Sequence, residues 1–183
     1  MAENVSLADL RDAVRTVSEQ VTAFAQELVR IKSVTGAEED IARFIAHRMR
    51  ELGYDQVTIN DYGSVIGRIG SGRRSLIFDG HIDTVAVHDA GEWQVGAFSG
   101  EIRGGRLYGR GSSDMKAAVA AMVYAGHLIK RLNLAVDKTV TISASTLEED
   151  FDGEALFHIC QELQPDYAVI CEPSNNRVVL GQQ

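Results

Sequence analysis

The chain has 183 residues, of which 45% are apolar and 24% charged, a balance typical of one globular domain and unlike that of a disordered protein. Its formal net charge of −8 argues against a nucleic-acid-binding protein and against binding to anionic membranes. Cys160 and Cys171 form no CxxC pair, so we expect a reducing compartment and two small buried side chains. No apolar run approaches the ~20 residues that span a bilayer, and no signal-peptide segment is visible, so we expect a cytoplasmic protein.

Two amphipathic helices are predicted first along the chain. Apolar residues recur at alternating steps of three and four over residues 7–31, which favours a long helix packed on its own domain, although a coiled-coil seam has the same spacing. Thr35 and Glu38 fit a capping box for a second helix over residues 41–52. Gly53 is placed to end that helix.

Strands and helices alternate over the rest of the chain. Strands are predicted at QVTIN, SVIGRI, SLIFDG, TVTISAST, YAVIC and, less regularly, RVVLG. A hairpin with Gly104-Gly105 at its turn is predicted in EIRGGRLYG, and helices are predicted over MKAAVAAMVYAGHLIKRL and residues 153–163. Several strands are apolar on both faces. The predicted fold is therefore α/β, with a mostly parallel central sheet sandwiched by helices.

Polar residues follow the ends of several predicted strands or begin a helix. These residues are His81, Asp83, Asp114, Glu148, Glu149 and Glu172. Ligands of open α/β sheets bind beyond the carboxyl ends of the strands, so in a parallel sheet these groups would converge at one edge. A histidine among several carboxylates needs neutralisation, and a divalent metal would provide it. The ligand types suit zinc, and also cobalt, nickel or manganese, and a shared carboxylate would allow a two-metal centre.

The spacing of these residues suggests individual roles. Residues i and i+2 of an extended chain point to the same side, so Asp83 can hydrogen-bond the ring nitrogen of His81 that faces away from the metal. Glu148 and Glu149 leave the backbone in different directions. One can bind metal while the other takes a proton from metal-bound water and passes it to a leaving amine.

Each candidate also has a plainer interpretation. Adjacent acids often form a solvated turn, Asp114 could be a simple helix N-cap, and Glu172 could be a loop acid. The remaining histidines have no comparable context, and we expect surface or packing roles for His47, His88, His127 and His158.

Four motifs carry a family resemblance. They are FDGHIDTV, GRGSSDMKAAVAAM, TLEED and VICEPS, in this order. Their order and spacing resemble the co-catalytic zinc hydrolases that include acetylornithine deacetylase, succinyl-diaminopimelate desuccinylase, aminoacylase and carboxypeptidase G. The stretch TLEEDFDG is most similar to the branch called selenium-metabolism-linked hydrolases. The resemblance covers nearly the whole chain.

The resemblance implies a set of metal ligands. His81, Asp114 and Glu172 would bind one ion. Asp114 would bridge to a second ion, which Glu149 would also bind. The peptide bond between Asp114 and Met115 would be cis.

The resemblance also implies an activity. The expected reaction is hydrolysis of an amide or peptide bond in an N-acyl amino acid or small peptide, with metal-bound hydroxide as nucleophile. Glu148 would be the general base, and Asp83 would orient His81. Two zinc ions are implied for each active site, with cobalt or manganese as alternatives, and the full-length form would be a homodimer.

Members of this family are much longer than 183 residues. After a segment like RVVLG they continue into a lid or dimerisation domain, and the returning chain carries the last histidine of the second metal site. Residues 1–183 are therefore expected to be the N-terminal portion of a catalytic domain, without the lid. The alternative hypothesis is an inactive fragment that binds at most one metal tightly and pairs with a missing half.

Overall fold

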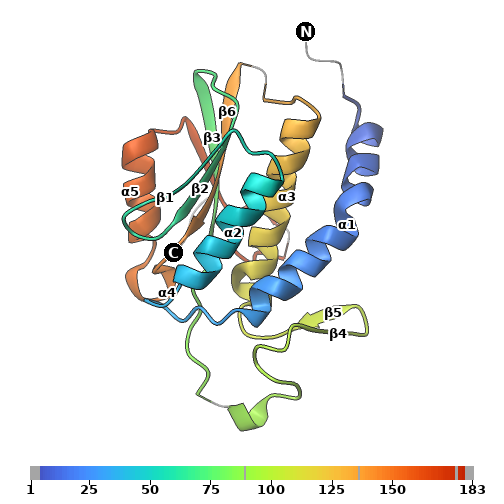
Figure 1. Cartoon of the computed structure of the whole chain (residues 1–183), viewed down its shortest axis with the longest axis vertical. Coiled ribbons are helices and arrows are strands. Elements are labelled where there is room, and N and C mark those ends of the chain that lie inside the picture. Colours follow the sequence, from blue (N-terminus) through green and yellow to red (C-terminus); the bar gives the residue numbers. More distant parts are fainter. Residues whose placement is uncertain (1–4, 89, 136, 176, 180–183) are drawn as a thin grey trace.

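The computed structural model describes residues 5–88, 90–135, 137–175 and 177–179. The helices are α1 (Leu7–Arg30), α2 (Glu39–Glu51), α3 (Ala117–Arg131), α4 (Glu148–Phe151) and α5 (Glu154–Leu163), with the short turns η1 (Ala90–Glu92) and η2 (Ser112–Lys116). The strands are β1 (Gln56–Ile59), β2 (Val65–Ile69), β3 (Arg74–His81), β4 (Glu101–Arg103), β5 (Arg106–Tyr108), β6 (Lys138–Ser145) and β7 (Tyr167–Ile170). Most predicted elements are present (Figure 1). The exception is RVVLG, whose described residues, 177–179, form no strand.

The central sheet is mixed, which corrects the prediction of a mostly parallel sheet. Its strand order is β1-β2-β6-β3-β7. β2 pairs antiparallel with β1 and β6, whereas β3 pairs parallel with β6 and β7. The short connection over residues 60–64 can only join antiparallel neighbours, because a parallel pair needs a longer crossover such as a helix. The part of the sheet that ends in the candidate residues is the parallel part.

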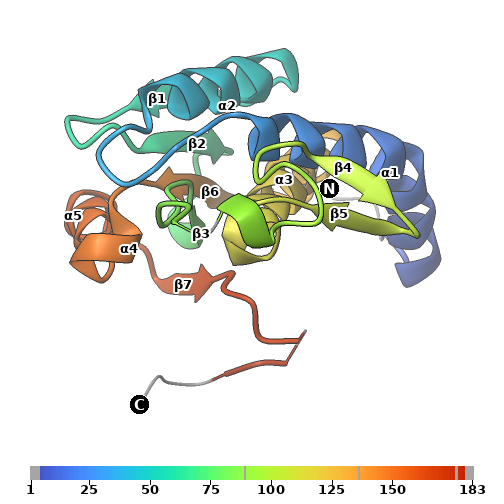
Figure 2. The same cartoon turned by 90° about the horizontal axis from the view of Figure 1, so that it is seen from below.

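Helices cover both faces of this sheet, as predicted for an α/β sandwich. α1, α2 and α3 lie on one side, and α5 lies on the other (Figures 1 and 2). The larger core cluster joins the three helices to the sheet, with fully buried side chains such as Phe24, Ile45 and Val123. A smaller cluster of Ile66, Ile77 and Ile159 lies under α5.

The predicted capping box at Thr35 and Glu38 is wrong. α2 begins after Glu38, and no side chain caps it by a hydrogen bond. Thr35 Oγ1 donates instead to Asp83 Oδ2 at 2.9 Å, and Glu38 Oε1 accepts from the backbone N–H of Leu147 at 3.1 Å. The two side chains have long-range partners that local sequence does not reveal. A capping box does form at Ser6, the N-cap of α1.

The cysteines and the other histidines are not among the predicted ligands, although Cys171 directly precedes Glu172 in the chain. Cys160 and Cys171 are free thiols, but they are half-buried rather than buried as predicted. The histidines meet the expectation of surface or packing roles: for example, His127 Nδ1 lies 2.9 Å from the carbonyl oxygen of Leu52, and His158 stacks on Tyr62. Among the described residues, no helix combines the length and apolar character that crossing a membrane requires.

Candidate metal centre

His81 ends β3 and presents one ring nitrogen to a group of acids. Its side chain is almost fully buried, and the backbone N–H of Ile82 continues the pairing with β6 by donating to the Ser145 carbonyl. His81 Nε2 lies 2.9 Å from Asp114 Oδ1, 3.9 Å from Glu148 Oε2 and 3.9 Å from Glu172 Oε1. Parallel β3, β6 and β7 bring His81, Glu148 and Glu172 together at their carboxyl ends, and Asp114 comes from η2 before α3.

Glu149 completes a second arrangement around the same histidine. One ligand atom each from His81, Asp114 and Glu149 lie within 4.8 Å of one another, a geometry that can hold a metal ion. The structure thus brings the predicted candidates together at one place. Which of them bind metal, and in which of two sites, stays a prediction.

The carboxylate of Asp83 connects the histidine to the two glutamates. It is fully buried, its Oδ1 accepts the backbone N–H of Glu148 at 3.1 Å, and its Oδ2 accepts the N–H of Glu149 at 3.0 Å. His81 Nδ1 lies 3.1 Å from the Asp83 carbonyl oxygen and 3.4 Å from Oδ1. Thr35 adds a third donor to the same carboxylate. Asp83 therefore fixes both the imidazole and the backbone that carries the glutamates.

Burial and neighbouring ionisable groups shift the pKa values of the residues in this cluster. Burial alone would lower the pKa of His81, but hydrogen bonds to Asp83 and Asp114 outweigh it and raise the pKa to about 10. Burial raises the pKa of Glu172 to about 7, with Asp114 and Glu148 adding to the rise against the effect of His81. Carboxylates outnumber the one imidazole, so the cluster lacks positive charge. A divalent cation fits this donor set, since imidazole with carboxylates is typical of zinc sites.

Comparison with known proteins identifies the family. The family model described as "Peptidase family M20/M25/M40" matches residues 77–181. The chain belongs to this peptidase family. The match confirms the resemblance inferred from the four motifs, while the narrower likeness to the selenium-linked branch stays a prediction.

Curated relatives in the M20 family are much longer than this chain. The uncharacterized protein YgeY of Escherichia coli (strain K12) is 32% identical over 100% of this chain and 46% of its own length. A succinyl-diaminopimelate desuccinylase of Caulobacter sp. (strain K31) is 32% identical over 89% of this chain and 43% of its own length. The chain therefore spans less than half the length of these relatives.

Solved structures share the fold of this M20 chain. The di-peptidase Dug1p from Saccharomyces cerevisiae superposes with a TM-score of 0.77 at 16% identity, covering 93% of this chain and 41% of its own. The M20 family metallo-carboxypeptidase Sso-CP2 from Sulfolobus solfataricus gives a TM-score of 0.72 at 20% identity, covering 83% and 37%. At these identities the likeness concerns the fold alone.

The start of α3 shapes the M20 site from a second direction. The Asp114–Met115 peptide bond is cis, as the resemblance predicted. Lys116, which follows, is fully buried and donates from Nζ to the carbonyl oxygen of Ile31 at 2.7 Å. Burial lowers the pKa of Lys116 to about 8. This contact ties the turn that carries Asp114 to the end of α1.

Sequence patterns did not predict several residues that support the candidate site. The sequence alone predicts a helix cap at Thr35 and Glu38 and no role for Lys116. Asp79 lies buried on β3 and accepts hydrogen bonds from the hydroxyls of Ser143 and Ser145 on β6. The signal for Asp79 was a carboxylate inside an otherwise apolar strand, and burial raises its pKa to about 6.

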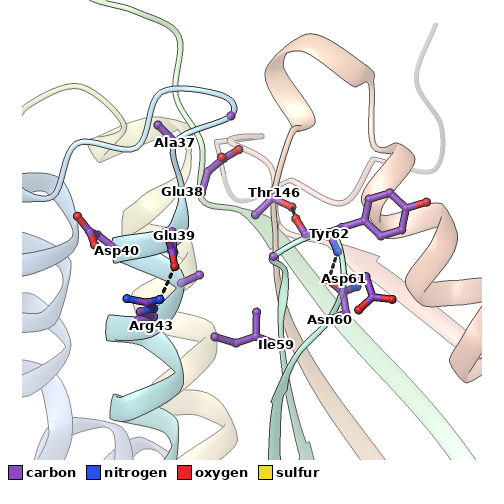
Figure 3. Close-up of a pocket in the computed structure, with 13 residues that line it drawn as sticks. Ala37, Glu38, Glu39, Asp40, Arg43, Ile59, Asn60, Asp61, Tyr62 and Thr146 are labelled. Carbon is purple, nitrogen blue, oxygen red and sulfur yellow. Dashed lines mark hydrogen bonds and ion pairs between the residues drawn. The ribbon is translucent and has the colours of Figure 1, made fainter.

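A cavity of 720 Å³ lies beside the M20 site but outside it. Figure 3 shows it between the N-terminal end of α2 and the β1–β2 connection. Glu38 and Thr146 line it, and Glu39 and Arg43 form an ion pair on the α2 side. None of the six predicted site residues lines this cavity. It adjoins the loop before Glu148 and offers no part of the candidate metal chemistry.

Proposed function

We propose that these residues belong to a metal-dependent hydrolase that cleaves the amide or peptide bond of an N-acyl amino acid or small peptide. The observation that carries the proposal is the arrangement around His81 Nε2, with Asp114, Glu148 and Glu172 within 3.9 Å in a chain of the M20 family. The names of the relatives, a desuccinylase, a di-peptidase and a carboxypeptidase, support this substrate class.

The proposed ligands follow the resemblance. His81, Asp114 and Glu172 would hold one ion, and Asp114 and Glu149 would hold a second. Zinc is the proposed ion, with cobalt or manganese as alternatives, and a bound ion would supply Lewis-acid chemistry at the carbonyl oxygen of the substrate.

Glu148 is the proposed general base. It would accept a proton from the attacking water and deliver it to the leaving amine. Burial raises the pKa of Glu148, the direction that favours proton uptake by a general base. Asp83 holds the backbone of Glu148 and faces His81 Nδ1, so it is a positioning residue rather than a proton carrier.

A Glu148→Gln substitution in the complete protein tests this role. We expect kcat for an N-acyl amino acid to fall by about 10²–10⁴-fold, the usual contribution of a general acid–base group, with metal content unchanged. Asp150→Asn is the matched control, because Asp150 is the exposed third acid of the same run. Near-normal turnover in Glu148→Gln would show that another group is the base.

A second hypothesis concerns residues 1–183 by themselves. The first ion would have three protein ligands, but the second would have only Asp114 and Glu149, fewer than catalytic zinc usually has. We propose that this piece alone binds at most one ion tightly and hydrolyses no amide. Calorimetric zinc titration of residues 1–183, beside an assay with N-acyl amino acids, tests it. Two tightly bound ions together with turnover would contradict it.

The cellular location and the oligomeric state are also proposals. A cytoplasmic location is supported by the two free thiols, since reducing compartments keep cysteines unpaired. A homodimeric full-length form is supported by the family resemblance alone.

A further inference from the structure

Leu147, the residue before the proposed base Glu148, has an unusual backbone conformation. It is the N-cap of α4, with φ 63° and ψ 19°, in the left-handed region. For a residue with a side chain, this conformation costs about 1–2 kcal/mol. Asp, Asn, Ser and Thr are preferred at N-caps because their side chains accept the free N–H groups, which a leucine side chain cannot do. The backbone before Glu148 therefore needs support from outside α4.

The backbone N–H groups of residues 146–149 all donate to side chains from other segments of the chain. The N–H of Leu147 donates to Glu38 Oε1 at 3.1 Å. The N–H group before it donates to Ser64 Oγ at 3.2 Å, and the two N–H groups after it donate to the carboxylate oxygens of Asp83 at 3.1 and 3.0 Å. Glu38 thus supplies the acceptor at the left-handed residue itself.

Glu38 reaches this N–H group from the connection between α1 and α2. Only 6% of the residue is exposed, and although it occupies the N-cap position of α2, its side chain makes no capping hydrogen bond there. In Figure 3 its carboxylate points from the start of α2 toward the segment that carries Thr146. Burying a carboxylate is unfavourable unless it accepts hydrogen bonds, so the contact with Leu147 explains where the side chain lies.

The α1–α2 connection is itself attached to the segment that follows β3. Ser33 Oγ donates to the carbonyl oxygen of Ile82 at 2.6 Å, and the backbone N–H of Thr84 donates to the carbonyl oxygen of Ser33 at 2.8 Å. Glu38 therefore extends from a backbone that is joined to the residues directly after His81. One connection thus contacts both the segment of the histidine and the segment of the two glutamates.

We propose that Glu38 is a positioning residue of the hydrolase, which holds Leu147 in its left-handed conformation and thereby orients Glu148. The inference rests on the proposed function. A hydrogen bond from a backbone N–H to a carboxylate is stronger than one between neutral groups, so it offsets the conformational cost at Leu147. Without it, Leu147 would return to the extended or right-handed region, and Glu148 Oε2 would leave its place 3.9 Å from His81 Nε2.

Substitution of Glu38 in the complete, metal-loaded protein tests this role. Glu38→Ala should lower kcat for an N-acyl amino acid about 10- to 100-fold and change KM little, because a small displacement of a catalytic group has effects of this size. Glu38→Gln should recover most of the rate, since its amide oxygen can still accept the N–H of Leu147. Glu39→Ala, at the exposed neighbouring acid, is the control. Equal losses of kcat in the Ala and Gln variants, or a loss in neither, would overturn the proposal.

Substitutions at Leu147 separate a backbone effect from a loss of packing. Glycine adopts the left-handed region freely, whereas alanine does not. In the Glu38→Ala background, Leu147→Gly should therefore restore part of the lost kcat, and Leu147→Ala should restore none. A substitution that merely loosens the fold would not distinguish the two residues. Equal kcat values in the Gly and Ala double variants would show that Glu38 does not act through the Leu147 backbone.

A hydrogen-exchange measurement keeps this test separate from the proposed function. If no amide is hydrolysed, the hydrolase proposal fails, and exchange of the N–H groups of residues 146–149, followed by mass spectrometry, decides whether Glu38 holds this segment. Support requires exchange about tenfold faster in Glu38→Ala, as expected for one lost hydrogen bond, and unchanged in Glu39→Ala. Unchanged exchange in Glu38→Ala would contradict it. If amides are hydrolysed, an unchanged kcat in Glu38→Ala overturns this inference alone.

Discussion

Helices α1, α2 and α3 cover one face of the central sheet. Strand β7, at one edge of the sheet, is exposed to solvent instead. Phe24 and Ile45 are fully buried on the closed face, but Tyr167 and Ile170 on β7 are 71% and 57% exposed. β7 is the last strand at one edge of the sheet (Figure 2). The same protein therefore contains a completed core and a strand with few packing contacts.

The candidate site also has buried side chains and exposed side chains. The side chains of His81 and Asp83 are 1% and 0% exposed, while those of Asp114 and Glu172 are 55% and 42% exposed. Groups that need a fixed orientation lie in the packed part, and groups that must meet a ligand lie where solvent reaches. Packing thus supplies the geometry of the site, and the exposed carboxylates supply its charge.

The largest expected effect is on stability and separates the two regions. Phe24→Ala should cost about 3–5 kcal/mol of unfolding free energy, because the ring is fully buried against Phe44 and Tyr124. Ile170→Ala should stay within about 0.5 kcal/mol, as an exposed position. Urea denaturation of both variants measures the difference. A loss at Ile170 as large as that at Phe24 would mean that β7 is covered in the protein.

The second prediction concerns zinc affinity and the buried residue Asp83 of the candidate site. Asp83→Asn should weaken zinc binding about 10- to 100-fold although Asp83 is a positioning residue, because outer hydrogen-bond partners of metal ligands have effects of this size. Calorimetric titration measures the affinity, and the exposed Asp150→Asn is the control. Unchanged affinity in Asp83→Asn would show that packing alone orients His81.

A smaller effect is expected at Thr35. Thr35→Val keeps the shape of the side chain but removes one of the hydrogen bonds to Asp83, so it should cost about 1 kcal/mol of stability. Thr58→Val on the exposed edge strand β1 is the matched control and should be close to neutral. Chemical denaturation distinguishes them. Equal costs for the two variants would argue that the Thr35 hydrogen bond contributes nothing.

The smallest effect lies on the surface and depends on pH. A hydrogen bond from Lys130, followed by one from the backbone N–H of Gly70, lowers the pKa of Asp55. The ionised form is therefore favoured by folding, and its stabilisation is present above the unfolded pKa of about 3.9 and lost as the pH falls through the lower folded value. Because the pair is largely exposed, we expect only about 0.2–1 kcal/mol.

Urea midpoints at pH 6 and pH 3 check this expectation. Asp55→Asn should be less stable than the unsubstituted protein at pH 6, and the gap should narrow at pH 3. A gap of the same size at both values would show that the charge of Asp55 is not its cause.

The sequence by itself determined the features that depend on neighbouring residues. The three-and-four spacing over residues 7–31 predicted α1, and Gly104-Gly105 predicted the β4–β5 turn, since periodicity and positive-φ preferences act locally. The position of His81 and the acids after apolar strands predicted where they would gather, because parallel strands end at a common edge. The four motifs predicted the family, and with it the cis bond after Asp114.

Only the tertiary structure decided which distant residues meet. The mixed order of the sheet and the hydrogen bonds of Thr35 and Glu38 to distant residues, in place of a helix cap, are not encoded in local spacing. Thr35 bonds to a residue 48 positions away, and Glu38 to one 109 positions away. Such partners compete successfully with a local cap because a buried carboxylate such as Asp83 gains more from every additional donor than an exposed helix end does.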